Sequence, residues 1–405
     1  MEKILKVLAM HNVSEKNKIQ GKPKANIYGF AVDETNSDPS TSVTYIEDAV
    51  GLRPASNTFN GTNGSFSGGS WLERYPFNAI RPVTFSDGKV STELNENNFK
   101  VNTNDEPVST TDDVMIEIPP VYWKFTKTET GYEVRWSSEK IDDGYQALAH
   151  ERGGVLKGNL YVGAYEGYFD KSLSASDRII SSLSGVTPAG GVSFTNQRNY
   201  AQRNGSGYDL VTFHTITLLQ ILFVTMFRTL NSQSIFKGLV SVSAVSSTGT
   251  LDTNGMYYGD NTNSGLAMKF MGIENLWGNT NMPIEGLLFD TNGEYLISDN
   301  TVFNNTGEGY PYKAVDSYTT SYGSSYISKA IGEQSGAFLP YLASGSATTY
   351  YCDYAYISAP ETYMQVIRYG GEYNKTTQAG IFYYRYIGLN TTSTVVCGRI
   401  QYLAP

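Results

Sequence analysis

Charged residues are scarce in this sequence. Asp, Glu, Lys and Arg make up only 17% of the 405 residues, and the net charge is -9. No block of Lys or Arg occurs, and an acidic chain without such a block lacks the basic surface that nucleic acids require. We therefore expect no nucleic-acid partner. Because 40% of the residues are apolar, the chain can build a substantial core and is not a disordered polyelectrolyte.

Long apolar segments and cysteines are also few. The most apolar stretch, residues 218–227, is too short to cross a bilayer, and the N-terminus lacks the small-residue cleavage site of a secretory signal. We expect no membrane insertion. Cys352 and Cys397 cannot make a disulfide framework. They could pair if their strands were neighbours, but two buried thiols are the simpler expectation.

The residue patterns of common catalytic and metal sites are missing. His11, His150 and His214 have no metal-ligand spacing, and there is no Gly-x-Ser-x-Gly elbow, Walker loop or Rossmann fingerprint. We expect no metal and no cofactor. His214 falls in an apolar helical stripe, where a hydrogen-bonded core histidine is more common than a ligand.

One group of carboxylates remains for catalysis. Asp142, Asp143 and Glu151 could form the acid pair of a glycan-degrading enzyme. Adjacent carboxylates in a sequence such as KIDDGY more often form a solvated turn. We therefore predict that the protein is not an enzyme, and a glycan-degrading activity is the less favoured alternative.

Tyrosine is abundant. The chain contains 31 tyrosines, and most of them follow residue 200. Tyr combined with Ser, Gly and Asn is the composition of antibody paratopes, because a Tyr ring offers a large contact area and a polar tip. A β-rich surface would also be rich in Tyr, because Tyr has a high strand propensity. Composition alone favours neither interpretation.

Local patterns divide the chain into three parts. Residues 1–25 combine a small apolar cluster with a Lys-rich segment, which suggests an attachment peptide or a frayed terminus. Residues 26–111 alternate short apolar runs with Gly, Asn, Ser and Pro clusters, which predicts a small β-rich domain with a loop over 57–70. The sequence SDGK at 86–89 predicts a hairpin turn.

Residues 112–405 predict mostly short strands and loops with two adjacent helices, an α+β fold. A hairpin is expected over 114–137 and a strand over 159–169. The first helix is expected over 194–204, capped by Ser193 or Thr195 and ended by Gly205. The second, over 212–230, carries a broad apolar stripe and is expected to be buried. The sequence DTNG occurs twice and predicts hairpin turns at 252–255 and 290–293 rather than calcium loops.

Five segments, in order, resemble motifs of the formylglycine-generating-enzyme-like family. They are VMIEIPPVYWK at 114–124, LYVGAYEGYF at 160–169, the helical region 191–222, GIENLWGNTNMPIEGL at 272–287, and VIRYGGEYNKTTQAGIFYYRY with VVCGRIQYL after residue 365. The resemblance implies a C-type-lectin-like domain over 112–405. The same fold displays the variable surface in target proteins of diversity-generating retroelements. A second resemblance covers nearly the whole chain. With ANIYGFAVDETNSDPSTSVTYIEDAVGLRPA at 25–55, IPPVYWKF at 118–125, KIDDGYQALAHERGG at 140–154 and YVGAYEGY at 161–168, the chain resembles a structural protein of phages that infect Gram-positive bacteria, which implies a virion fibre or tail protein.

The resemblance assigns structural roles to six residues. It implies that Trp277 fills the core with its indole N–H bonded to a carbonyl, and that Gly278 and Asn279 adopt positive φ. Gly370 and Gly371 would allow two backbones to approach closely. Arg399 would be a buried arginine paired with a carboxylate, with Glu274 as the candidate. The enzymes of this family need two copper-binding cysteines close together, and Cys352 and Cys397 match no such motif.

The same resemblance places a displayed surface near the C-terminus. Alternation in the sequence IFYYRY puts Phe382, Tyr384 and Tyr386 on one face and Tyr383 and Arg385 on the other. The residues that we predict to bind ligand are Tyr350, Asp353, Tyr356, Glu372, Tyr373, Asn374, Lys375, Tyr383 and Arg385. Each of these tyrosines could instead cover the fold or line a subunit interface.

The expected function is therefore that of a bacteriophage fibre or tail protein on the virion surface, assembled in the host cytoplasm. Its expected partners are two further copies of itself in a homotrimer, other virion proteins through the N-terminus, and a host cell-wall glycan or glycopolymer. A structural head or capsid-decorating fibre with little receptor affinity is the alternative.

Overall fold

The computed structural model describes residues 25–59, 64–109, 111–314, 323–331, 338–357 and 359–405. The predicted attachment peptide at 1–25 lies outside these residues, apart from its last position. Many short strands accompany two α-helices, α2 (Phe194–Gln202) and α3 (Phe213–Phe227), so the fold has the expected α+β composition. Short 3-10 helices lie at Phe77–Ala79, Leu148–His150, Ser232–Ser234 and Thr376–Gln378. No described helix has both the length and the apolarity to cross a membrane.

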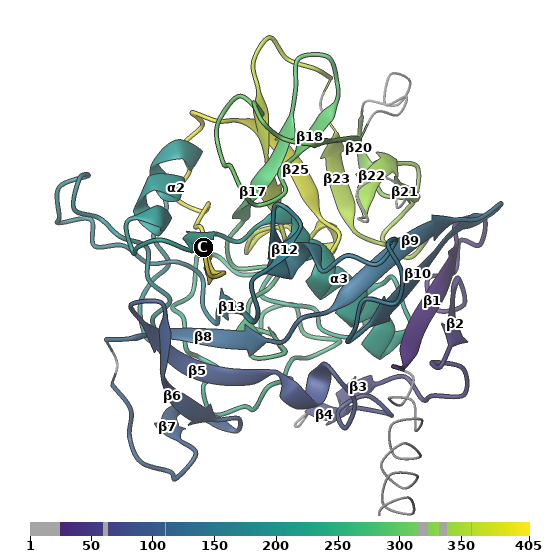
Figure 1. Ribbon diagram of the computed structural model, residues 1–405, viewed down its shortest axis with the longest axis horizontal. Helices are drawn as coiled ribbons and strands as arrows, with labels where there is room; N and C mark the ends of the chain where they lie inside the picture. Colours follow the sequence, from purple (N-terminus) through teal and green to yellow (C-terminus); the bar gives the residue numbers. More distant parts are fainter. Residues whose placement is uncertain (1–24, 60–63, 110, 315–322, 332–337, 358) are drawn as a thin grey trace, which may run out of the picture.

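A four-stranded antiparallel sheet lies at one side of the molecule (Figure 1). Its strands, in spatial order, are β2 (Val43–Glu47), β1 (Ile27–Asp33), β10 (Gly131–Ser137) and β9 (Tyr122–Lys127). Aromatic rings hold its inner face to the core: Trp71 contacts Tyr28 and Trp136 with centroid distances of 5.5 and 6.2 Å. These rings are buried, and each contributes a large apolar area to the core.

A first seven-stranded sheet joins distant parts of the chain. Its order is β14 (Tyr208–Leu210), β26 (Ile400–Tyr402), β13 (Leu160–Gly163), β8 (Asp113–Ile118), β5 (Arg81–Ser86), β6 (Lys89–Asn95) and β7 (Asn98–Asn102). The predicted SDGK turn connects β5 to β6, with Asp87 and Gly88 at φ of 52° and 73°. The hairpin predicted over 114–137 is limited to β9 and β10. Pro119 and Pro120 separate β8 from β9, and β8 pairs with β5 and β13 instead.

The predicted domain boundary between residues 111 and 112 is wrong, because it divides both of these sheets. β1 pairs with β10, and β5 pairs with β8. Residues on both sides of the boundary also belong to one continuous apolar core. The reason is that β1 and β5 each complete their hydrogen bonding with a strand after residue 111, and composition does not reveal such non-local pairing.

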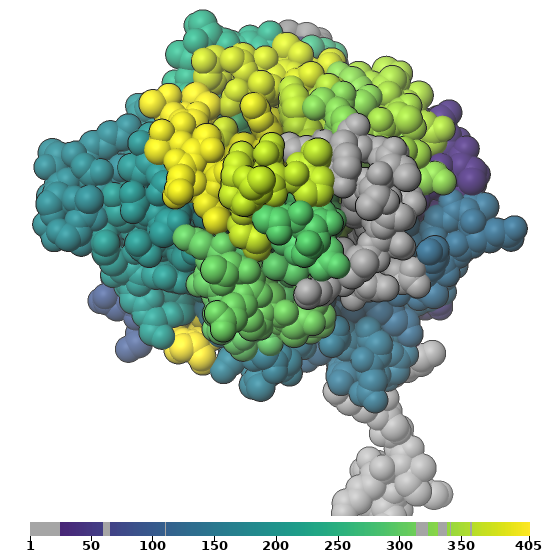
Figure 2. All heavy atoms as spheres, turned by 90° about the horizontal axis from the view of Figure 1, so that it is seen from above, coloured from purple at the N-terminus to yellow at the C-terminus, as the bar shows by residue number. Residues whose placement is uncertain are grey.

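A second seven-stranded sheet forms the upper part of the molecule in Figure 1. Its order is β19 (Tyr312–Ala314), β18 (Tyr295–Ile297), β17 (Met282–Phe289), β24 (Gln365–Tyr369), β25 (Tyr384–Gly388), β23 (Tyr354–Ile357) and β20 (Gly323–Tyr326). All pairs are antiparallel except β23 with β25. Figure 2, seen from above, shows the green-to-yellow C-terminal third gathered on this face. The second DTNG sequence forms the predicted turn between β17 and β18.

Four two-stranded pairs complete the described strands. They are β3 (Ser56–Phe59) with β4 (Gly64–Ser67), β11 (Glu151–Arg152) with β12 (Val155–Leu156), β15 (Lys269–Phe270) with β16 (Ile273–Glu274), and β21 (Lys329–Ile331) with β22 (Leu339–Leu342). The first pair lies where a loop was predicted over 57–70. Phe66 anchors this hairpin by stacking on Tyr257, with ring centroids 4.6 Å apart. The Gly-rich sequence does not predict this contact.

Helix α3 is buried on every side and lies at the centre of the fold. All of its 15 residues are buried, so its polar side chains must find partners inside the protein. Gln220 Nε2 donates to the Ile381 carbonyl at 2.8 Å, and Thr225 accepts from the indole of Trp136 at 3.0 Å. Helix α2 begins at a predicted capping residue: Ser193 accepts from the Asn196 N–H. Thr212, for which no cap was predicted, caps α3 by accepting from the Thr215 N–H. Each helix is slightly shorter than predicted.

The segment 272–287 has the structural role that the resemblance implied. Trp277 is fully buried, and its indole donates to the Phe236 carbonyl at 3.2 Å. Gly278 and Asn279 have φ of 81° and 55°, as predicted. Gly370 lies close to the backbone of this segment: a Cβ atom there would be 3.0 Å from the Leu276 carbonyl oxygen. Trp277 is therefore a core residue rather than the wall of a site.

Arg399 is buried as predicted, but its partners differ. Its guanidinium donates to the main-chain carbonyls of Gly163 at 2.8 Å and Glu274 at 2.7 Å. The carboxylate of Glu274 instead accepts from Thr250 and from the Leu251 N–H. The predicted ion pair is therefore wrong, because main-chain carbonyls accept from Nη1 and Nη2 of Arg399, and Thr250 and the Leu251 N–H donate to the carboxylate of Glu274.

Glu285, in the same segment, does form a buried ion pair. Arg198 on α2 donates from Nε and Nη2 to the two Glu285 oxygens at 2.6 and 2.8 Å, and both side chains are almost completely buried. Arg198 also donates to Asn305 Oδ1 at 2.6 Å. This bidentate contact fixes α2 to β17.

Candidate functional site

The structure brings together three of the predicted binding residues. Tyr356 on β23 and Tyr383, just before β25, have ring centroids 6.1 Å apart. The Arg385 guanidinium lies 5.0 Å from the Tyr356 centroid, a cation–π contact. The Tyr356 hydroxyl donates to Gln378 at 2.9 Å. An arginine and two tyrosines from two strands therefore form one group.

A fourth residue of this group, Arg368 on β24, was missed by the sequence prediction. Arg368 is the direct cross-strand partner of Arg385. Its neighbours Ile367 and Tyr369 belong to the main core, so strand alternation places Arg368 on the opposite side of the sheet, together with Arg385. The period-two rule applied to the sequence VIRYGG would have found it. We call Arg368, Arg385, Tyr356 and Tyr383 the arginine–tyrosine cluster.

One member of the cluster is buried with unpaired donors. Arg368 is 5% exposed, and its Nε and Nη2 atoms have no acceptor. The hydroxyl of the buried Tyr383 lies against the Arg385 side chain. Burial, and then the like charge of Arg385, lower the pKa of Arg368 to about 10. Burial raises the pKa of Tyr383 well above its ordinary value. Such unsatisfied groups are costly, and they concentrate at functional sites.

The predicted residues 372–375 lie beside the cluster. Glu372 is nearly buried; it accepts from Asn281 and forms an ion pair with Lys375 at 3.4 Å. Tyr373 is half-buried, and its N–H donates to the Asn279 carbonyl at 3.1 Å. Asn374 is exposed. Because backbone hydrogen bonds dock this segment on the core, its side chains are held in place rather than carried on a free loop.

Two predicted binding residues have other roles. Asp353 is completely buried: it accepts from the Phe382 N–H at 2.8 Å and from Ser232, and burial raises its pKa well above the ordinary range. Tyr350 packs against the main core, and its N–H donates to the Ser37 carbonyl at 2.8 Å. The prediction that Asp353 and Tyr383 are displayed is therefore wrong, because Ser232 and the Phe382 backbone cover Asp353, and Tyr383 is buried beside Tyr356 and Arg385.

A cleft of about 540 Å³ lies at the other end of β24 and β25. It is lined by Asn305, Tyr363, Met364, Gly388, Leu389, Asn390 and Thr391. Tyr363 is 51% exposed, the most exposed tyrosine among the large apolar side chains at the surface. An exposed ring beside amide and hydroxyl groups suits a sugar, whose C–H face stacks on the ring. Sequence reasoning did not select these residues, because Asn305 joins them only through the fold.

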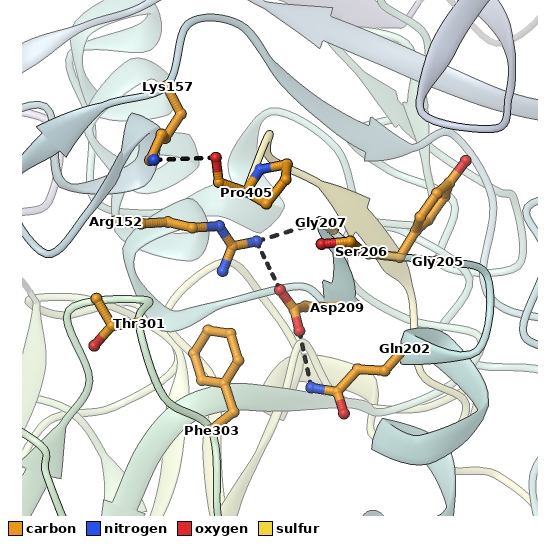
Figure 3. A pocket seen from close by; sticks show the side chains of 11 residues that line it. Arg152, Lys157, Gln202, Gly205, Ser206, Gly207, Asp209, Thr301, Phe303 and Pro405 are labelled. Carbon is orange, nitrogen blue, oxygen red and sulfur yellow. Dashed lines mark hydrogen bonds and ion pairs between the residues drawn. The ribbon is translucent and has the colours of Figure 1, made fainter.

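In a second cleft, of about 620 Å³, the charged side chains bind one another and main-chain carbonyls (Figure 3). Arg152 donates to Asp209 at 2.9 Å and to the carbonyls of Asn300 and Leu403 at 2.7 and 3.1 Å. Gln202 donates to the second oxygen of Asp209 at 3.0 Å. The charged groups here satisfy one another, so this cleft is a structural junction.

The residues considered for catalysis do not form a catalytic group. Asp142 pairs with Lys124 at 2.9 Å, and Asp143 pairs with Lys140 on an exposed turn. Glu151 is buried and accepts from the Ala147 N–H. Within the residues that the structure describes, no three His, Cys, Asp or Glu side chains are arranged to hold a metal.

The buried histidine and cysteines agree with the sequence prediction. His214 contacts the Ser298 carbonyl through Nε2 at 2.8 Å, as expected of a core histidine. Cys352 and Cys397 are buried free thiols, and burial raises the pKa of both. Neither thiol is therefore a ready nucleophile.

Comparison with known proteins leaves the family open. No protein-family model matches this chain, and no curated protein matches it.

Proposed function

We propose that this protein is a virion fibre or tail protein that binds a host cell-surface glycan through its C-terminal face. The observation that carries the proposal is the arginine–tyrosine cluster. The Nε and Nη2 atoms of its buried Arg368 have no partner within the described residues, whereas another buried arginine, Arg198, donates to Glu285 and Asn305. A fold that leaves such donors unpaired on one sheet face is prepared for a ligand.

The cleft beside Tyr363 supports the same proposal. It lies at the opposite end of the same two strands, so one extended ligand could contact both sites. Tyrosine rings stack on sugars, and arginines bind their polar or charged substituents. The proposal includes a C-type-lectin-like arrangement of residues 112–405 and a homotrimer, in which many weak sites act together.

Binding of the full chain to purified Gram-positive cell walls tests the proposal. We expect the protein to sediment with walls of a susceptible host. Tyr356→Ala and Tyr363→Ala should each weaken binding, whereas Tyr122→Ala, on β9 in the four-stranded sheet, should not. Equal sedimentation of all four proteins would contradict the proposal.

The alternative functions predict other outcomes. A structural or capsid-decorating fibre would sediment with no wall preparation but would still assemble with virion proteins. A glycan-degrading enzyme would release soluble sugar from the walls, and Asp143→Asn would stop the release. The ion pair of Asp143 on an exposed turn gives no support to this second alternative.

A further inference from the structure

The two arginines of the arginine–tyrosine cluster face each other with like charge. Arg368 and Arg385 are opposed in the antiparallel pair β24–β25, on the side of the sheet away from α3, which contacts Tyr384. Side chains in such positions have Cβ atoms about 5 Å apart, and like charges there destabilise the sheet. A native protein that keeps this arrangement gains something other than stability from it.

The positive charge of this face is not neutralised by the described residues. The carboxylate that acts on Arg368 is Glu372, which is already bound to Lys375 and Asn281. Arg368, Arg385 and Lys375 thus carry three positive charges against one negative charge. The net charge of this face is therefore positive, although the net charge of the whole chain is -9.

Exposure differs between the two arginines. Arg385 is half-buried and can reach a ligand at the surface, whereas Arg368 is buried next to it. The free Nε and Nη2 atoms of Arg368 form one edge of a guanidinium, the edge that binds an oxyanion with two parallel hydrogen bonds.

We infer that Arg368 and Arg385 bind an anionic group of the ligand, a phosphate or a carboxylate, as the missing counter-ion of this face. That the anion is carried on a glycan rests on the proposed function; the anion site itself rests on the two arginines. The ligand class is therefore an acidic glycopolymer, with the anion at the arginines and sugar rings against Tyr356.

Calorimetry with inorganic phosphate and with acetate, at constant ionic strength, tests the site in the full chain. We expect saturable binding of at least one of the two anions, and the tighter one identifies the ligand group. Arg385→Gln should weaken that binding about tenfold or more, as loss of a charge-assisted contact does. Arg53→Gln, at an exposed arginine distant from this sheet, is the matched control and should bind as the wild type does.

A second variant separates binding from folding. Arg368→Met removes a buried charge that has no counter-ion, so we expect a higher melting temperature without ligand and loss of anion binding. A lower melting temperature would show that Arg368 is a structural residue. Anion binding that is absent from the wild type, or equal in all variants, would overturn the inference.

The outcomes for the anion and for the cell wall are independent. Phosphate or acetate binding without wall binding would contradict the proposed function and keep the anion site. Wall binding that persists unchanged in Arg368→Met and Arg385→Gln would keep the proposed function and contradict the anion site.

Discussion

Replacement of Arg198 by Met tests how much the buried ion pair with Glu285 holds the C-terminal half together. The variant keeps the aliphatic part of the side chain over Phe194, where the guanidinium carbon now lies 4.7 Å from the ring centroid. It removes both hydrogen bonds to Glu285 and those to Asn305 and to the Asn304 carbonyl. Loss of one partner of a buried pair costs about 3–5 kcal/mol, because the other charge stays buried and uncompensated.

This loss should be measurable as a change in melting temperature. An unfolding entropy of about 2.1 cal/mol/K per residue gives ~0.85 kcal/mol/K for a chain of 405 residues. A loss of ~4 kcal/mol should therefore lower the melting temperature by ~5 °C at pH 8. Differential scanning calorimetry, with urea unfolding as a second measurement, is the assay.

The loss of stability should depend on pH in Arg198→Met but not in Glu285→Gln. Burial raises the pKa of Glu285, and Arg198 opposes this shift, so the pKa rises further in Arg198→Met. A carboxyl whose folded pKa is raised contributes stability at low pH and loses it as pH rises through that pKa. The defect of Arg198→Met should thus be smaller at pH 5 than at pH 8. Glu285→Gln leaves Arg198 buried without a carboxylate, and an arginine cannot lose its proton, so the stability loss of this variant should be the same at pH 5 and pH 8.

A double-mutant cycle with Arg198→Met and Glu285→Gln completes the test. We expect the double variant to be more stable than the sum of the single losses implies, by ~2 kcal/mol or more. If the two losses add within ~0.5 kcal/mol, or if the Arg198→Met defect is the same at both pH values, the reasoning is refuted.

Three further predictions concern the core. Burial lowers the pKa of His214 to about 4, below its value in the unfolded chain. The neutral His214 therefore stabilises the fold above pH 6.5, and this stabilisation is lost as the pH falls. In urea unfolding, His214→Gln should reduce the decrease in the free energy of unfolding at acid pH by up to ~3 kcal/mol. Gly278→Ala should cost ~2 kcal/mol or more in the same assay, because φ is 81° and the new Cβ would lie 2.8 Å from the Leu239 carbonyl oxygen; Gly309→Ala, at φ 79° in open space, should cost ~1 kcal/mol. Cys352 and Cys397 should react with a thiol reagent only after unfolding, and modification of the native protein within minutes would contradict their burial.

The parts of the fold that could be predicted are those set by local chemistry. The cap at Ser193, the positive φ of Gly278 and Asn279, and the buried Trp277 follow from residue type and from neighbours in the chain. The domain boundary at 111/112 could not be predicted in this way. It depends on which strands pair across long sequence separations, and the composition on either side changes without any break in the sheets.

The candidate site was half predictable for a similar reason. Alternation in IFYYRY correctly separates Tyr384 and Tyr386 from Arg385, and the same rule would have found Arg368. Asp353 was misplaced because its burial depends on Ser232, more than a hundred residues earlier in the chain. The sequence around a polar side chain does not indicate which distant residue will donate to it and bury it.

The position of β26 has a consequence for the time at which this protein can fold. This strand, at Ile400–Tyr402, lies between β14 and β13, so the sheet that reaches back to β5 stays open until these residues have been synthesised. During synthesis β13 and β14 lack this partner strand until long after they have emerged. Pairing over such distances is slow and leaves strand edges open to neighbouring chains. A chain that stops before β26 should therefore yield aggregates rather than a stable fragment.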